Sequence, residues 1–112
     1  MEARELLHRI WRLVEEKKGE RMLAIEVGKI SPLCSYFLIA SGSATIHVKT
    51  MAEHVISGLK AEGILPHHVE GLENGIWVLL DYGEVVVHLF VREEREYYGL
   101  ERLWSDAPLI FE

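Results

Sequence analysis

A few residues are of types that could support catalysis, so their spacing is the first thing to test. Gly42-Ser43 lies between a predicted strand and a predicted helix, where nucleotidyltransferases keep a Gly-Ser pair beside a phosphate. Such enzymes also need paired carboxylates, commonly Asp-x-Asp, to hold two metal ions about 4 Å apart. The chain has only two aspartates, Asp81 and Asp106, and Glu53 has no carboxylate two residues away. The sequence therefore favours a helix-capping turn, with Ser43 as the N-cap, over phosphoryl transfer.

The histidines and the cysteine do not form a recognisable metal or nucleophile motif. His67 and His68 are adjacent on a predicted strand and face opposite ways, so they cannot easily share one ion. His47 and His54 lack the i, i+4 spacing of a helical zinc site. Cys34 is the single cysteine, which excludes an internal disulfide and fits a reducing compartment. We expect Cys34 to be a small buried hydrophobe and predict neither a metal nor a cofactor.

Length and composition favour one domain spanning residues 1–112. With 49% hydrophobic residues, a chain of this length can bury a substantial core. It shows no secretion signal and no apolar run near the ~20 residues that a membrane helix needs, so we expect a cytoplasmic protein.

The charge is divided unevenly between the two halves of the chain. Residues 1–61 contain seven acidic and nine basic side chains, whereas residues 62–112 contain eleven acidic and three basic ones. An acidic surface repels phosphate backbones and speeds the approach of basic partners. The second half is therefore predicted to bind a basic protein rather than nucleic acid.

The hydrophobic pattern predicts alternating helices and strands. We expect a first helix that stops at Lys17-Lys18-Gly19, a helix over 43–62 that ends at Gly63, and a last helical segment over 92–104 with a possible break at Gly99. Leu100, Leu103 and Trp104 are expected to point inward from that segment. Strands are predicted over residues 22–27, 36–41, 67–71, 76–81 and 84–91. The expected fold is an α/β domain with a mixed five-stranded sheet and flanking helices.

The last two predicted strands form a hairpin, and their two faces raise the main functional question. With Tyr82-Gly83 as the turn, Leu80 lies opposite Val85 and Trp77 lies opposite His88. One face is then wholly aliphatic and should be core. The other face is also mostly apolar but carries an indole and an imidazole: Trp77, Leu79, Val86, His88 and Phe90. Three helices are few to cover five strands, so we expect this second face to stay partly open for a partner or for self-association as a homodimer.

Two segments of the chain resemble the ribosomal silencing factor family, also called Iojap-like. They are YFLIASGSATIHVKTMAEHV, residues 36–55, and EGLENGIWVLLDYGEVVVHLFVREEREYYGLERLW, residues 70–104. The similarity covers about residues 3–107. Its specific motifs are Glu-Gly, Trp-Val-Leu-Leu-Asp-Tyr-Gly, Val-His-Leu-Phe and a closing Tyr-x-Leu-Glu-x-Leu-Trp.

The resemblance implies a fold like that of nucleotidyltransferases without their catalytic carboxylates, and a protein that is not an enzyme. It implies binding to protein fourteen of the large ribosomal subunit, where the small subunit would dock, so that subunit joining is blocked sterically and translation is repressed. The predicted partner-binding residues are Trp77, Leu79, Asp81, Tyr82, His88, Phe90, Tyr98, Leu100, Glu101 and Trp104. We expect Trp77→Ala to weaken ribosome binding with little loss of folding.

The chain departs from the family pattern at two positions. Cys34-Ser35 stands where an aspartate commonly precedes the Tyr-Phe pair, and Glu26 replaces an aspartate after the first strand. These departures leave the loop around Cys34 without an implied role, and the free protein is expected to be either monomer or homodimer.

Overall fold

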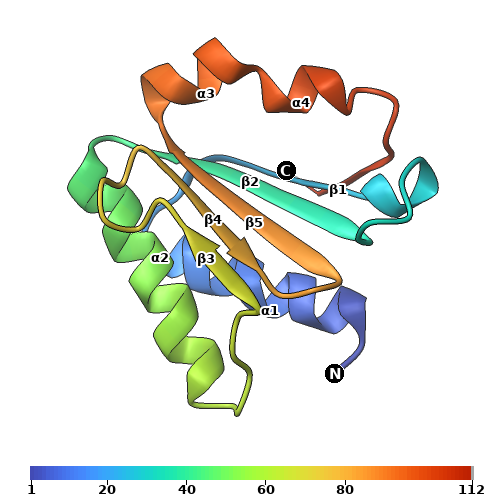
Figure 1. Ribbon diagram of the computed structural model, residues 1–112, viewed down its shortest axis with the longest axis horizontal. Helices are drawn as coiled ribbons and strands as arrows, with labels where there is room; N and C mark the ends of the chain where they lie inside the picture. The colour runs from blue at the N-terminus through green and yellow to red at the C-terminus, as the bar shows by residue number, and fades with distance from the viewer. Residues whose placement is uncertain (112) are drawn as a thin grey trace.

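The computed structural model describes residues 1–111 and has helices on both sides of one mixed sheet (Figure 1). Its helices are α1 (Ala3–Glu16), the 3-10 turn η1 (Val27–Lys29), α2 (Thr45–Lys60), α3 (Arg92–Tyr98) and α4 (Leu100–Leu103). Its strands are β1 (Glu20–Ile25), β2 (Tyr36–Gly42), β3 (His68–Glu70), β4 (Trp77–Asp81), β5 (Val85–Val91) and β6 (Leu109–Phe111). The strand order is β3-β4-β5-β2-β1-β6, and β2 and β5 are the parallel pair.

The sheet has six strands in residues 1–111, so the expectation of five was wrong. The added strand, β6, pairs antiparallel with β1 at the edge, where Ile25 lies opposite Leu109. Three residues after a proline are too few to show alternation, which is why the pattern did not reveal this strand. The α/β class and the flanking helices are confirmed, while the likeness to nucleotidyltransferases stays a prediction.

One face of the sheet, here called the first face, is covered by the two long helices. The inward positions of α1 and α2 are fully or nearly fully buried, as their helical spacing predicts. They pack on the alternate residues of the central strands, among them Leu38, Val78, Leu80, Val87 and Leu89. These five side chains are completely shielded from solvent, so this face holds the main core.

The hairpin of β4 and β5 has a different register from the one expected. Leu80 pairs with Val87 and Trp77 pairs with Phe90, which is a shift of two residues. The turn consists of Gly83-Glu84 rather than Tyr82-Gly83, because Tyr82 N–H donates to the carbonyl of Val85 at 2.9 Å. The left-handed φ of +86° at Gly83 suits this turn. A shift of two residues leaves each side chain on its predicted face, since strand side chains alternate with period two.

The opposite face, here called the second face, is crossed by α3 and α4 (Figure 1). Gly99 separates these short helices with a left-handed φ of +56°, so the predicted break at this residue is confirmed. Leu100 and Trp104 pack against the sheet as expected. Leu103 does not, because it is 77% exposed, and its predicted inward orientation was wrong.

Candidate functional site

The part of the second face beneath α3 is closed by aromatic packing. The ring of Trp77 stacks on Phe90 and also contacts Tyr98, with ring centroids 4.8 Å apart in both pairs. Phe90 is fully buried and His88 is 4% exposed. The expectation that Phe90 lines an open face was therefore wrong, because Trp77 and Tyr98 cover its ring.

Tyr82 is also unsuited to direct contact with a partner. Its ring belongs to the core of the first face and is only 6% exposed, and burial raises the pKa of its hydroxyl to about 12. Sequence reasoning placed Tyr82 at a turn tip, where exposure is the rule. The shifted register instead makes Tyr82 the last pairing residue of the strand.

A buried arginine holds the C-terminal helices onto the sheet. Arg95 of α3 is 3% exposed and donates from Nη1 to the hydroxyl of Ser41 at 2.9 Å. Its Nε donates to Glu101 of α4 at 2.9 Å, and Nη1 also lies 3.3 Å from the carbonyl of Glu20. Burial lowers the pKa of Arg95, and the Glu101 carboxylate opposes that change. Glu101, predicted to bind a partner, thus already has an internal partner.

The other end of the second face is open and forms a pocket of about 420 Å³. Its walls come from the end of β4, the first half of β5, the start of β2, the loop before β2 and the residue that follows α4. The apolar lining residues are Val27, Leu33, Phe37, Leu79, Val86 and Trp104. Three of the predicted partner-binding residues, Leu79, Asp81 and Trp104, are half-buried here, and Leu33 is 87% exposed at the rim.

One wall of the pocket is the His88 ring, whose tautomer follows from its neighbour. Trp77 Nε1–H donates to His88 Nδ1 at 3.2 Å, and an indole nitrogen can only donate. Burial lowers the pKa of His88 to about 4, so the ring is neutral at neutral pH and its proton lies on Nε2. Nε2 is buried and has no hydrogen-bond partner within residues 1–111. A residue that lines the pocket therefore has one buried donor without a partner.

The rim of the pocket is acidic. Asp81 uses Oδ1 to accept the N–H of Gly83 at 2.8 Å, and Glu84 accepts the hydroxyl of Ser35 at 2.7 Å through Oε2. Cys34 also lines the pocket, and the pKa of its thiol is raised by burial and by these two carboxylates. Cys34 is therefore protonated at neutral pH and poorly suited to act as a nucleophile.

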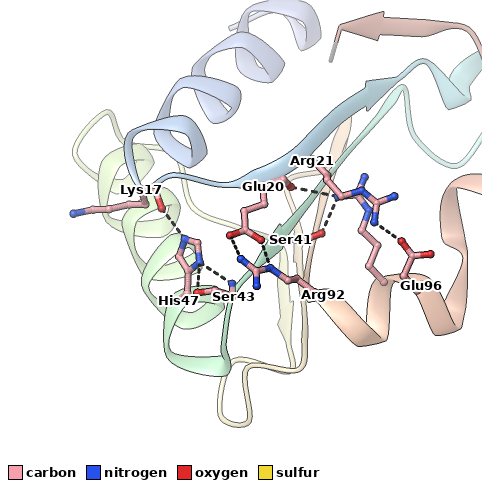
Figure 2. A network of polar contacts seen from close by, with 9 residues as sticks. Lys17, Glu20, Arg21, Ser41, Ser43, His47, Arg92 and Glu96 are labelled. Atoms are coloured by element: carbon pink, nitrogen blue, oxygen red, sulfur yellow. Dashed lines mark hydrogen bonds and ion pairs between the residues drawn. The ribbon is translucent and has the colours of Figure 1, made fainter.

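The Gly42-Ser43 turn lies elsewhere, within a network of internal polar contacts (Figure 2). Ser43 does not cap α2, whose N-cap is Ala44, so that prediction was wrong. Instead, Ser43 N–H donates to Nδ1 of His47 at 2.9 Å, and His47 Nε2 lies 2.8 Å from the Lys17 carbonyl. Because that carbonyl only accepts, Nε2 carries the proton and Nδ1 is already engaged. Both nitrogens of His47 are therefore used in internal contacts, and neither is free to act as a base for Ser43.

No metal centre is found in the described part of the chain. Within residues 1–111, no group of three or more His, Cys, Asp or Glu side chains could hold an ion. His68 lies beside Glu70, with 3.5 Å between Nε2 and Oε2, and His67 instead faces the rim of the pocket. The opposite directions predicted for these two histidines are consistent with their placement.

Leu33 and Phe37 are two of the pocket residues that sequence reasoning missed. Leu33 lies in a proline-containing turn, which was interpreted only as a connection, and Phe37 lies in a strand expected to be covered on both faces. The signal that could have found Leu33 is a large apolar residue in a turn, where side chains are usually exposed.

Comparison with known proteins identifies relatives over nearly the whole chain. The family model described as "Ribosomal silencing factor during starvation" matches residues 1–112. A ribosomal silencing factor from Halalkalibacterium halodurans is 39% identical over 98% of this chain and 94% of its own length. A crystal structure of a Chromobacterium violaceum protein superposes with a TM-score of 0.91 at 34% identity, covering 94% of this chain and 88% of that one.

A more distant relative has a name that specifies one ribosomal subunit. "Mitochondrial assembly of ribosomal large subunit protein 1" from Mus musculus is 30% identical over 83% of this chain and 42% of its own length. Separately, none of the helices in the described residues has the length and apolar character needed to cross a membrane.

Proposed function

The chain belongs to the ribosomal silencing factor family, and from that premise we propose that it binds the large ribosomal subunit and blocks its joining to the small subunit. The proposed contact is protein fourteen of the large subunit, and the proposed mechanism is steric occlusion that represses translation in the cytoplasm. The observation that carries the proposal is the open end of the second face, an apolar surface with an acidic rim in the acidic half of the chain.

The chemistry of this surface supports a basic protein partner. Apolar side chains exposed together supply contact area, and Leu33 and Trp104 border the same pocket. Asp81 lines the pocket and Glu84 follows the lining residue Gly83 in the chain, so both carboxylates raise the rate of encounter with a positively charged partner. A ribosomal protein has such a charge because it lies against rRNA.

The proposed contact set is therefore narrower than the sequence pattern suggested. We assign direct contact to five of the exposed or half-buried members, Leu79, Asp81, Tyr98, Leu100 and Trp104, and add Leu33. Trp77 and Glu101 are also half-buried, but they make internal contacts that stabilise the fold. Tyr82, His88 and Phe90 are buried, so we assign them a supporting role without direct contact to the partner. Trp77→Ala would leave Nδ1 of His88 unpaired and so does not separate folding from binding.

Leu79→Lys is the sharper test of this assignment. The variant places a positive charge on the half-buried wall of the pocket, where it opposes both apolar contact and a basic partner. We expect wild-type protein to sediment with purified large subunits and not with small subunits. The variant should bind large subunits at least about tenfold more weakly, since losing one central contact costs about 1.4 kcal/mol or more.

Ile46→Lys is the matched control. Ile46 is 69% exposed on α2, which covers the first face, so the same charge change there should leave binding as in wild type. Circular dichroism and urea unfolding establish that both variants are folded. Equal loss in both variants would exclude the pocket end as the site, and wild-type binding to neither subunit would refute the proposal itself.

The proposal also treats the chain as a binding protein rather than an enzyme. A surviving transferase would need a nucleotide triphosphate and magnesium, so calorimetric titration with both should give no heat of binding. The mass of the free protein in solution distinguishes a monomer from a homodimer that hides the same surface. A dimer that dissociates on addition of large subunits would indicate that the two interactions compete.

A further inference from the structure

We propose that the pocket at the open end of the second face is a small-molecule site that selects a neutral aromatic compound with a carbonyl group. The pocket has about 420 Å³, within the range of ligand sites in proteins. The inference goes beyond the silencing role, and its test uses the isolated protein, so either proposal can fail without the other.

The selection for a carbonyl group comes from the His88 ring. Trp77 occupies Nδ1 as a donor, which fixes the proton of the neutral ring on Nε2. His88 is 4% exposed, and its Nε2 is buried without a hydrogen-bond partner within residues 1–111. An unpaired buried donor is destabilising, so a ligand that brings an acceptor to it gains affinity from the hydrogen bond.

The selection for an aromatic ring comes from the walls. Phe37 packs edge-on against both His88 and Trp104, with ring centroids 4.6 Å and 5.2 Å apart. These three rings and the aliphatic side chains of Leu79 and Val86 line the same pocket. A flat ligand can extend this edge-to-face arrangement, which aromatic groups favour over aliphatic contact of equal area.

The selection for a neutral compound comes from the rim. Asp81 lines the pocket, Glu84 is hydrogen-bonded beside it through Ser35, and both carboxylates repel an anion. A cation would be attracted to this rim, yet it could not accept the hydrogen bond that Nε2 of His88 offers. A neutral amide satisfies both conditions, because its carbonyl accepts and its N–H groups can donate to Asp81.

Four probes that share one ring separate these requirements: benzamide, toluene, benzoate and benzylammonium. We expect two-dimensional NMR titration of the isolated protein to rank benzamide first, with shifts at the backbone amides of Cys34, Leu79 and Val86. Toluene should bind about tenfold more weakly because it lacks the acceptor, and benzoate more weakly still. Benzylammonium should show no advantage over toluene in high salt, where the rim charge is screened.

Two variants test the geometry separately. His88→Phe keeps a ring and removes the donor, so the preference for benzamide over toluene should fall from about tenfold to none. Val86→Trp keeps His88 and fills the pocket, so every probe should lose binding. Equal affinity of wild type for benzamide and toluene, shifts centred elsewhere, or no binding up to the solubility limit would each overturn the proposal.

Discussion

The two faces of the sheet are stabilised in different ways. The first face is covered by α1 and α2 and buries aliphatic residues of the central strands completely. The second face is covered by the short helices α3 and α4, which are held by one buried arginine and one aromatic stack. Strand β4, for example, contributes Val78 and Leu80 to the sealed core and Leu79 to the surface with the pocket.

This difference assigns most of the folding stability to the first face and the proposed partner binding to the second face. A face sealed by long helices can tolerate little change, because each buried side chain is in contact on all sides. A face covered at one end only leaves apolar residues available without exposing the main core. Function can therefore change on the second face while folding energy is supplied mainly by the first.

Neighbouring leucines of β4 give the largest expected contrast. Leu80 is fully buried on the first face, so Leu80→Ala should lower the free energy of unfolding by about 4 kcal/mol. Leu79 is half-buried on the second face, and Leu79→Ala should cost about 1 kcal/mol. Urea unfolding measures both values. The comparison of the two faces breaks down if the Leu79 variant proves as unstable as the Leu80 variant.

Binding should show the reverse order. At a temperature where both variants are folded, Leu79→Ala should weaken binding to large subunits about tenfold, because its side chain borders the proposed surface. Leu80→Ala removes nothing from that surface and should bind like wild type.

Acid should destabilise the protein through His88. Burial lowers the pKa of His88 in the folded state to about 4, below its ordinary value of 6.5. The neutral ring therefore contributes full stability above pH 6.5, and that contribution is lost as the pH falls toward 4. The loss approaches about 3 kcal/mol, since each unit of pKa difference corresponds to about 1.4 kcal/mol.

The carboxylates also titrate in this range, so the measurement is a difference. Free energies of unfolding at a series of pH values from 7 to 4 are compared between wild type and His88→Phe. The slope that His88 contributes should be missing in the variant. Parallel curves would mean that His88 has the same pKa in the folded and unfolded protein, and so that this ring is accessible to water.

The first face could be predicted from the sequence and the second face only in part. Helical spacing located Val48, Met51 and Val55 in the core, and strand alternation separated Val78 from Leu79 correctly even though the register was shifted by two. These signals are local, because each follows from the period of one element. The break at Gly99 is local in the same sense.

The features that escaped prediction depend on contacts between distant segments. Arg95 is a charged residue in a charged segment, and nothing local indicates that Ser41 and Glu101 bury it. The cover over Phe90 depends on where Tyr98 lies in space, eight residues away and on another element. The edge strand at Leu109 forms because β1 offers an unpaired edge. Each would have required the tertiary structure in advance.

Two arginines of α3 provide the final and smallest contrast. Arg95 is 3% exposed and bonded to Ser41 and Glu101, whereas Arg92, one turn earlier, forms a two-pronged ion pair with Glu20 and its side chain is 58% exposed. Arg95→Met keeps most of the volume but leaves the Ser41 hydroxyl and the Glu101 carboxylate without their donor. We expect a loss of about 2 kcal/mol, less than for a fully buried pair because Glu101 retains some contact with water. Arg92→Met is the matched control and should leave stability close to that of wild type, since solvent screens exposed pairs.

Amide hydrogen exchange locates the effect: in Arg95→Met, protection should fall first in α3 and α4 and persist in β5, because the arginine holds the cover and not the core. Equal loss of protection in β5 would mean that the two faces fold and open as one unit, and that Arg95 stabilises the core as well as its cover.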